Sequence, residues 1–88
     1  MNSFVYIVEC NDGTYYTGWT NDIEKRLIAH NNGKASKYTR GRIPVKLVYL
    51  EKLVTKSDGL KRELCIKKLT RSEKEELIRE YRNSKKNL

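Results

Sequence analysis

Five side chains in this sequence carry the functional groups needed to cut a phosphodiester bond. They are two tyrosines, one arginine, the only histidine and one glutamate. A guanidinium can neutralise the charge that builds up on phosphorus, and a histidine or tyrosine beside a water molecule can take its proton. Brought together, they would line a single cleft. The candidate catalytic residues are Tyr6, Tyr16, Arg26, His30 and Glu63.

One carboxylate is enough to hold Mg²⁺, because this ion keeps several water ligands and takes others from substrate phosphate. Glu63 could therefore serve as the protein's metal ligand, and Arg26 and the metal would neutralise charge on the transition state. A tyrosine could act as the base only if its pKa lies well below the ordinary value of about 10. His30 could accept that proton or hold the tyrosine hydroxyl.

A second candidate site is a cationic run in residues 33–43, which contain four basic side chains and no acid. Cations neutralise phosphates, and an aromatic ring among them can stack on an unpaired base. Such binding is weakened by salt and hardly depends on base sequence. The simpler explanation is a solvated surface loop. The candidate nucleic-acid-binding residues are Lys34, Lys37, Tyr38, Arg40 and Arg42.

The two candidate tyrosines fall in a predicted β-hairpin. Residues 4–8 and 15–19 are rich in β-branched and aromatic side chains, which is typical of strands, and residues 11–13 (Asn-Asp-Gly) favour a tight turn between them. The hairpin is short enough for Tyr6 and Tyr16 to lie close together. The sequence leaves the register, and therefore the shared face, open.

Helices are expected to carry the other three candidates. Asn21 with Glu24 resembles a capping box, and Gly33 is a natural helix end. On this helix Arg26 and His30 are four residues apart and lie next to each other, beside an apolar stripe of Ile23 and Leu27.

A second helix is expected to begin at Ser57 and to bury Leu60 and Leu64, with Glu63 and Lys67 flanking that stripe. A strand over residues 45–50 precedes it. The third helix begins at either of two capping boxes, Thr70 to Glu73 or Ser72 to Glu75, and turns Leu77, Ile78 and Tyr81 inward.

The predicted fold class is α+β, with a three-stranded sheet flanked by helices in the order β-β-α-β-α-α. Residues 1–82 would form one domain and residues 83–88 a polar tail that frays. Of 88 residues, 19 are basic and 11 acidic, so the net charge of +8 favours an acidic partner. Plain solubility would explain the charge equally simply.

Two cysteines, Cys10 and Cys65, are too few for a zinc site or a disulfide framework, and we expect both to be small core residues. With no secretory signal, they indicate a reducing, cytoplasmic location. No apolar stretch is long enough to span a membrane. We therefore expect a monomer that binds nucleic acid and no membrane.

In order and spacing these motifs resemble the GIY-YIG nuclease superfamily over residues 3–80. Residues 5–7 (Val-Tyr-Ile) and 16–18 (Tyr-Thr-Gly) are similar to the two tripeptides that name the family. Arg26 and His30 fit its Arg-x-x-x-His/Tyr pattern, and Glu63 fits its metal-binding glutamate. Residues 37–42 and 66–69 are similar to the short, stand-alone, single-domain bacterial branch.

The resemblance implies a GIY-YIG-like fold and an endonuclease that hydrolyses DNA with one Mg²⁺ or Mn²⁺ ion. Its substrate would be branched, damaged or single-stranded DNA in repair or processing. It implies that Tyr6 is the general base, Tyr16 positions water or phosphate, Arg26 stabilises charge, His30 assists and Glu63 binds the metal.

The chain departs from the family pattern at several positions. Phe4 stands where the first tripeptide has glycine, and Val5 and Thr17 stand where the tripeptides have isoleucine, which are structural positions. Larger nucleases of the family carry a late asparagine near the site, whereas this chain has none between Glu63 and Asn83, which implies slow catalysis. Without a second domain to select a site, we expect little sequence specificity.

Each candidate also has a simpler explanation. Tyr6 and Tyr16 suit a strand without any catalytic task, and Arg26 could pair with Asp22 on the same helix. His30 near a helix C-terminus would be favoured by the helix dipole alone. Glu63 could pair with Lys67 at i, i+4. Two rivals to the nuclease therefore stay open: a non-catalytic nucleic-acid-binding module with the same fold, and a protein whose basic face meets an acidic partner.

Overall fold

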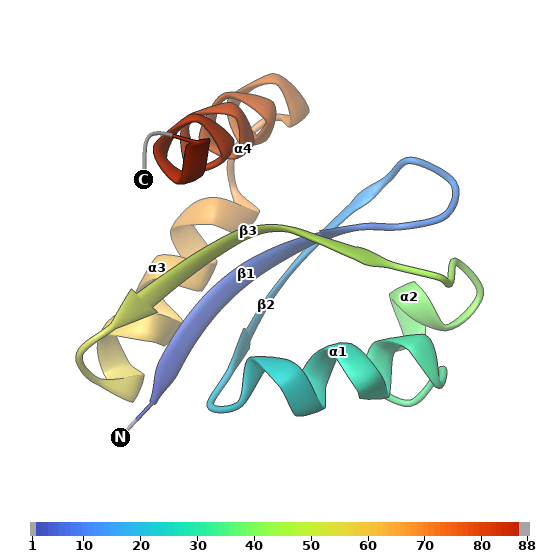
Figure 1. Ribbon diagram of the computed structural model, residues 1–88. Coiled ribbons are helices and arrows are strands. Elements are labelled where there is room, and N and C mark those ends of the chain that lie inside the picture. Colours follow the sequence, from blue (N-terminus) through green and yellow to red (C-terminus); the bar gives the residue numbers. More distant parts are fainter. Residues whose placement is uncertain (1, 87–88) are drawn as a thin grey trace.

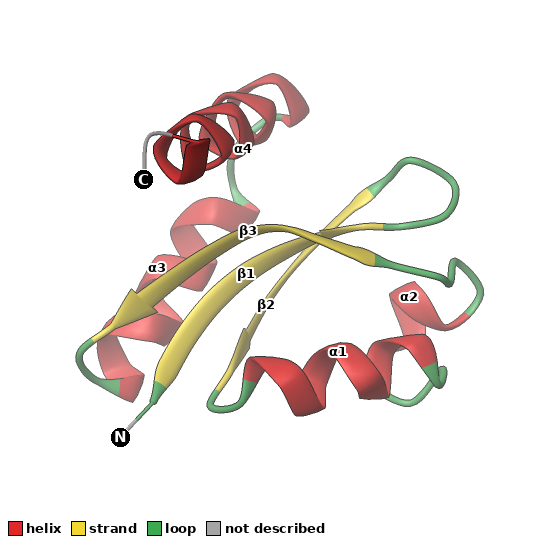
Figure 2. Cartoon of the chain, viewed as in Figure 1, coloured by secondary structure: helices red, strands yellow, loops and turns green. Residues whose placement is uncertain are grey.

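The computed structural model describes residues 2–86 and has the α+β architecture that the sequence predicts (Figures 1 and 2). A three-stranded antiparallel sheet in the order β2-β1-β3 lies at its centre, with helices on both faces. Within the described residues no helix is both long and apolar enough to cross a lipid bilayer. The elements are β1 (Ser3–Glu9), β2 (Tyr15–Thr20), α1 (Ile23–Asn31), α2 (Lys37–Arg40), β3 (Lys46–Leu53), α3 (Lys56–Lys67) and α4 (Arg71–Lys86).

The central strand β1 separates two hydrophobic clusters. Val5 and Ile7 point to one face, where they pack with Ile66 of α3 and Ile78 of α4. Tyr6 and Val8 point to the other face, which α1 covers. Residues 5–8 have no exposed surface at all, because β1 is covered on both faces and paired along both edges. Any polar group on this strand must therefore find its partner inside the protein.

The β1–β2 hairpin forms as the sequence predicts. The Cys10 amide donates to the Thr14 carbonyl oxygen at 2.8 Å, and Gly13 has φ 85°, a conformation that favours glycine. Asp12 Oδ1 accepts hydrogen bonds from both the amide and the hydroxyl of Thr14. In the resulting register Tyr6 lies opposite Gly18, and Val8 lies opposite Tyr16.

Two of the expected helix starts are wrong by one or two residues. Asp22, rather than Asn21, is the N-cap of α1, and its carboxylate accepts from the Lys25 amide at 3.1 Å. Thr55, rather than Ser57, is the N-cap of α3, and its hydroxyl accepts from the Asp58 amide at 3.1 Å. The strand before it ends at Leu53 instead of residue 50.

Of the two capping boxes considered for the last helix, the earlier one forms. The Thr70 amide donates to Glu73 Oε1 at 2.9 Å, and the Glu73 amide donates to Thr70 Oγ1 at 3.2 Å. The helix α4 continues to Lys86, so the residues 83–86 assigned to a fraying tail are helical, and residues 87–88 lie outside the described residues. The expected inward side chains Leu77, Ile78 and Tyr81 all pack against the core.

The segment 33–43, expected to be all loop, contains the short helix α2. Ser36 caps it by accepting a hydrogen bond from the Thr39 amide at 3.3 Å. The segment reads as a loop from its glycines and small residues, but residues 37–40 include none of the strong helix breakers. The element order is therefore β-β-α-α-β-α-α.

The expected buried stripe of α3 is also wrong. Leu60 and Leu64 are 39% and 59% exposed, and Cys65, expected in the core, is exposed, whereas Cys10 is buried as expected. The buried residues of α3 are Gly59 and Ile66, which are seven apart and share one face. The face of α3 with Gly59 and Ile66 packs on the sheet because the helix comes very close to the strands there. Only a glycine, which has no side chain, leaves room for that contact.

Gly59→Ala is expected to destabilise the fold. A Cβ at this position would collide with Ser3 Oγ and Trp19 Nε1. Overpacking typically costs about 1–3 kcal/mol, of which alanine recovers up to about 1 kcal/mol through its helix propensity. Urea denaturation would measure the loss. Gly41→Ala is the control, because a Cβ there meets nothing within 4 Å. Equal stability of the two variants would contradict the close approach of α3.

Candidate active site

A chain of hydrogen bonds runs through the interior from Tyr6 to Thr39. Tyr6 Oη lies 2.7 Å from His30 Nε2, and His30 Nδ1 lies 2.9 Å from Thr39 Oγ1. All three residues are 0% exposed. They come from β1, the last turn of α1 and α2, so three elements meet at one buried polar contact.

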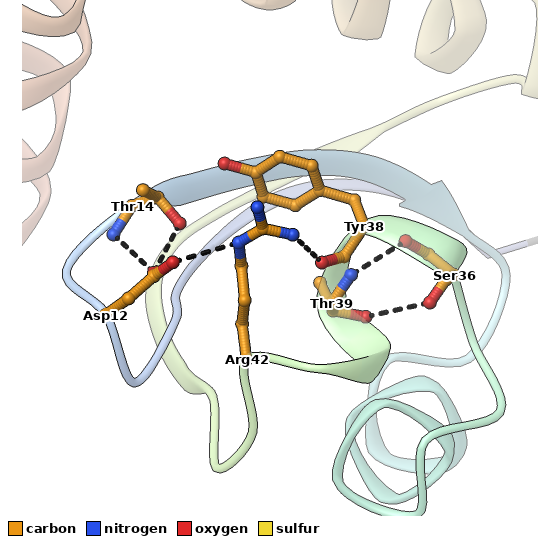
Figure 3. Close-up of polar contacts among 6 residues, drawn as sticks. All are labelled: Asp12, Thr14, Ser36, Tyr38, Thr39 and Arg42. Carbon is orange, nitrogen blue, oxygen red and sulfur yellow. Dashed lines mark hydrogen bonds and ion pairs between the residues drawn. The ribbon is translucent and has the colours of Figure 1, made fainter.

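The hydrogen bonds of Thr39 indicate which ring nitrogen of His30 carries the proton. The Thr39 hydroxyl donates to the Ser36 carbonyl oxygen at 3.4 Å, as Figure 3 shows, which leaves its own oxygen to accept from His30 Nδ1. A neutral imidazole protonated on Nδ1 has a lone pair on Nε2. The Tyr6 hydroxyl therefore donates to His30 Nε2, and a proton path runs from Tyr6 to His30.

Burial keeps both members of this pair neutral. It lowers the pKa of His30, and the positive charge of Arg26 lowers that pKa further. Burial raises the pKa of Tyr6 far above its ordinary value, although the neighbouring Arg26 guanidinium opposes the rise. The low tyrosine pKa that a preformed base would need is thus absent from this site, and the helix dipole does not leave His30 charged.

Gly18 makes room for the Tyr6 ring. It lies opposite Tyr6 on β2, and a Cβ at this position would come within 2.5 Å of the Tyr6 hydroxyl oxygen. The ring therefore extends over the bare backbone of β2, which is an edge strand. The glycine of the second tripeptide thus brings the buried hydroxyl to the edge of the sheet.

Tyr16 lies beside the buried pair, as the sequence predicts. Its ring centroid is 6.5 Å from that of Tyr6 and 5.4 Å from that of His30. Its ring is also stacked on Tyr38 of α2, with centroids 5.9 Å apart and planes 25° apart. Unlike Tyr6, Tyr16 is partly exposed and can meet a ligand from solvent.

A polar clamp holds Tyr38 against Tyr16 (Figure 3). Arg42 Nη1 donates to the Tyr38 carbonyl oxygen at 2.6 Å, and the Arg42 guanidinium carbon lies 4.2 Å from the centre of the Tyr38 ring. Arg42 Nε also pairs with Asp12 Oδ2 at 2.9 Å. The hydrogen bonds from Thr14, and then Arg42, lower the pKa of the Asp12 carboxyl. The turn of the hairpin is thereby tied to α2.

Arg26 forms the boundary between this buried chain and solvent. It is partly exposed, and its charge acts on both Tyr6 and His30. The ion pair with Asp22 considered from the sequence is not formed among the described residues, and the Asp22 carboxylate caps α1 instead. Arg26 Nε is buried and has no hydrogen-bond partner within the described part of the chain. A buried donor of this kind is costly unless a ligand satisfies it.

Glu63 approaches from the opposite face of the sheet. It lies on α3, its side chain is 16% exposed, and it pairs with Lys67 Nζ at 3.2 Å, as the simpler explanation predicts. Its negative charge nevertheless raises the pKa of Tyr6 slightly, so the carboxylate and the hydroxyl share one electrostatic environment. Tyr6 reaches over the edge strand β2 from one face of the sheet, and Glu63 lies on the helix that packs on the other face.

The donor set at this edge suits a metal that brings most of its own ligands. No cluster of three or more His, Cys, Asp or Glu side chains that could hold a metal occurs among residues 2–86. Glu63 therefore offers a single carboxylate. Mg²⁺ accepts such a site, because it retains water and binds substrate phosphate, whereas a structural zinc site needs four protein ligands.

The structure divides the cationic candidates into two groups. Lys34, Lys37 and Arg40 are exposed and available to a phosphate backbone. Arg42 is engaged with Asp12 and Tyr38, and the Tyr38 ring already has two stacking partners. Tyr38 and Arg42 thus also support Tyr16, and the nucleic-acid-binding role of all five residues stays a prediction.

Sequence reasoning missed Thr39 and the importance of Gly18. Thr39 lies among basic residues in the sequence, and nothing nearby marks its hydroxyl as functional. Its role is visible only in the structure, where it is completely buried beside His30. Gly18 could have been identified, because a glycine in a strand often marks a close approach.

Comparison with known proteins gives one consistent result. The GIY-YIG catalytic domain model matches residues 2–87. The UPF0213 protein CPE1444 of Clostridium perfringens is 58% identical over 86% of this chain and 82% of its own. The solution structure of the UPF0213 protein BH0048 from Bacillus halodurans aligns with a TM-score of 0.58, 45% identity and coverage of 89% of this chain and 83% of that one. The protein EF2693 from E. faecalis aligns with a TM-score of 0.63, 38% identity and coverage of 93% and 88%.

Replacing Thr39 should change the proton position on His30. In Thr39→Val the Nδ1 hydrogen loses its acceptor, so we expect a shift toward the Nε2-protonated tautomer and a loss of about 1–3 kcal/mol of stability. Thr39→Ser keeps the hydroxyl and should preserve the tautomer. Imidazole ¹⁵N chemical shifts report this without ambiguity, because the chain has one histidine. An unchanged tautomer in Thr39→Val would contradict the assignment.

Stability should fall as the pH drops below about 6.5, the ordinary histidine value. The unfolded chain binds a proton there, whereas burial lowers the pKa of folded His30 and keeps it neutral. The free energy of unfolding should decrease by up to about 1.4 kcal/mol per pH unit until the folded-state pKa is reached. Urea denaturation of the wild type and of His30→Gln tests this. In His30→Gln the free energy of unfolding should fall less steeply with decreasing pH. If the plots of unfolding free energy against pH are parallel for the two proteins, His30 is not the source of the pH dependence.

Proposed function

This chain belongs to the GIY-YIG catalytic-domain family, and on that premise we propose that it is an endonuclease that hydrolyses DNA phosphodiester bonds with little sequence specificity. One observation carries the proposal: a hydrogen-bonded tyrosine–histidine pair lies beside an arginine whose buried Nε has no partner among residues 2–86. The pair can move a proton, and the arginine can receive a phosphate. Proton transfer from the attacking water and binding of the phosphate are two requirements of phosphodiester hydrolysis that these side chains can meet.

The proton path begins at the attacking water. As the water oxygen bonds to phosphorus, its proton passes to Tyr6 Oη, while the Tyr6 proton passes to His30 Nε2. The bond from phosphorus to the leaving oxygen breaks, and the leaving oxygen takes a proton from solvent. Tyr6 thereby acts as a base without existing as a free tyrosinate, which its raised pKa would forbid. The lowered pKa of His30 keeps Nε2 unprotonated and ready to accept at neutral pH.

Arg26 has two tasks in this proposal. Its guanidinium pairs with the phosphate and offsets the negative charge of the transition state. Tyr6 and His30 have no exposed surface, so the substrate meets the partly exposed Arg26 and Tyr16 first. Pairing with the phosphate would satisfy Arg26 Nε and draw the side chain outward, which would open the hydroxyl beneath it to water.

Glu63 would hold one divalent cation, Mg²⁺ or Mn²⁺, which supplies Lewis acidity at the phosphate and at the leaving oxygen when bound. Lys67 competes for the same carboxylate at 3.2 Å, so substrate phosphate is expected to strengthen metal binding. The large net charge of +8 and the exposed Lys34, Lys37 and Arg40 would attract the DNA backbone without reading bases.

The proposal extends to the setting of the reaction. The protein would act as a monomer in the cytoplasm, where DNA repair or processing supplies damaged or branched strands. Cys10 and Cys65 are both free thiols, which suits a reducing environment.

The decisive experiment compares the wild type with two variants on nicked, single-stranded and branched DNA. We expect cleavage that needs Mg²⁺ or Mn²⁺, is abolished in Glu63→Gln and falls about 10²–10⁴-fold in Tyr6→Phe, the usual contribution of a general base. Both variants should still fold and bind DNA. Glu80→Gln on the exposed side of α4 is the matched control and should cut normally.

Two outcomes would contradict parts of this proposal. Full cleavage by Glu63→Gln would reject Glu63 as the metal ligand, although the protein would still be a nuclease. Equal DNA binding by all variants with no cleavage by the wild type would identify a non-catalytic binding module. The Glu63–Lys67 ion pair is the observation that favours that second function.

A further inference from the structure

A groove with a volume of about 420 Å³ opens beside Arg26, and neither Tyr6 nor His30 is among the residues that line it. We call it the Trp19 groove. The end of β2, the beginning of α1 and the beginning of α3 form its walls, and the side chains used below are Trp19, Asp22, Lys25, Arg26 and Lys56. In Figure 1 the beginnings of α1 and α3 both lie at the end of the sheet nearest the N-terminus.

The charge of the Trp19 groove is positive. Lys25, Arg26 and Lys56 line it, and among the described residues of its wall Asp22 is the one acid. The Asp22 carboxylate is engaged as the N-cap of α1, where it accepts a hydrogen bond from the Lys25 amide. Three cations thus face one committed carboxylate, which favours an anionic occupant.

Two helix dipoles add to this charge. The helices α1 and α3 both begin at the groove, α1 after Asp22 and α3 at Lys56, and they are 9 and 12 residues long. The N-terminus of each helix carries partial positive charge, which suits phosphate oxygens. The cationic side chains and the two helix N-termini therefore both favour a negatively charged ligand.

Arg26 belongs to both the groove and the active site. Its charge acts on Tyr6 and His30, while its side chain lines the groove. An extended ligand could therefore continue from one to the other with Arg26 at the junction. The orphaned Arg26 Nε is a donor already in place at that junction.

We propose that the Trp19 groove binds the phosphate backbone of the cleaved strand, at the nucleotide next to the scissile phosphate, through Lys25 and Lys56. This inference rests on the proposed function, because it names the path of the substrate beyond the catalytic residues. The volume matches a small-ligand pocket, so the groove itself would hold a short stretch of the backbone of one strand. The groove would strengthen DNA binding and orient the strand relative to the catalytic residues. It would make no contacts that distinguish one base from another.

Trp19 makes the groove observable. It is the one tryptophan of the sequence, its Nε1 donates to Ser3 Oγ at 2.9 Å, and Lys56 Nζ lies 5.3 Å from its ring. A phosphate that draws Lys56 away from the indole changes the surroundings of the only tryptophan. Tryptophan emission therefore reports on the surroundings of one side chain, which lines this groove.

The experiment titrates the Glu63→Gln protein with a single-stranded DNA oligonucleotide without a divalent metal, so that no strand is cut. Tryptophan emission and a labelled-DNA binding assay are followed at several salt concentrations. Lys25→Gln/Lys56→Gln in the same background should weaken binding about tenfold or more at low salt. It should also lower the slope of log K against log salt by roughly 0.7 per lost contact and remove most of the emission change.

The control variant is Lys46→Gln/Lys52→Gln, which removes the same charge from two exposed positions on β3, the far edge strand. It should retain the emission change and most of the affinity. An oligonucleotide of RNA and a blunt duplex of the same sequence complete the set. RNA and single-stranded DNA should behave alike, because the groove contacts backbone, and the duplex should give a smaller emission change.

The outcomes separate this inference from the proposed function. Equal losses in the two double variants, or no emission change when DNA binds, would overturn the groove. Metal-dependent cleavage by the wild type would then still support the nuclease. A groove-dependent emission change with no cleavage under any condition would support the groove and reject the nuclease. If no nucleic acid binds at low salt, the groove proposal is rejected.

Discussion

The structure depends on one buried hydroxyl group. Tyr6 lies on a central strand that is covered on both faces, so its oxygen cannot reach bulk water and must be satisfied by the protein. His30 supplies the partner, and His30 in turn requires Thr39. A polar group in the core thus fixes where α1 ends and where α2 lies relative to the sheet. The hydrogen bonds that position the candidate catalytic groups are therefore the same ones that hold α1 and α2 against this face of the sheet.

Burial is the stronger electrostatic effect at this site. Arg26 is close enough to stabilise a tyrosinate, yet burial outweighs it and leaves the Tyr6 hydroxyl protonated. Burial and Arg26 act in the same direction on His30, which keeps the imidazole neutral. A neutral donor and a neutral acceptor in contact form a proton relay that needs no charged resting state. The dry surroundings that make free tyrosinate costly also protect that relay from competing water.

The sequence predicted the hairpin and the neighbouring positions of Arg26 and His30 better than the boundaries and faces of the helices. The hairpin follows from strand propensity and a turn that needs glycine, and the pairing of Arg26 with His30 follows from helical spacing. Local signals failed where tertiary contact decides. Leu60 and Leu64 have the right spacing for a buried stripe, but the sheet accepts the face with Gly59 because the approach is so close. The short helix α2 was missed because its purpose, to place Thr39 against His30, has no local signature.

The placement of Glu63 on the far side of the sheet has a consequence for the stability of the candidate site. Arg26 and His30 come from a helix on one face, and Glu63 comes from a helix on the other. Neither helical layer carries the complete set of candidate groups, so their relative positions depend on an intact three-stranded sheet between them. Partial unfolding of either layer would therefore separate these groups. If the proposed function holds, a partly unfolded copy would lose cleavage altogether rather than cut DNA without control.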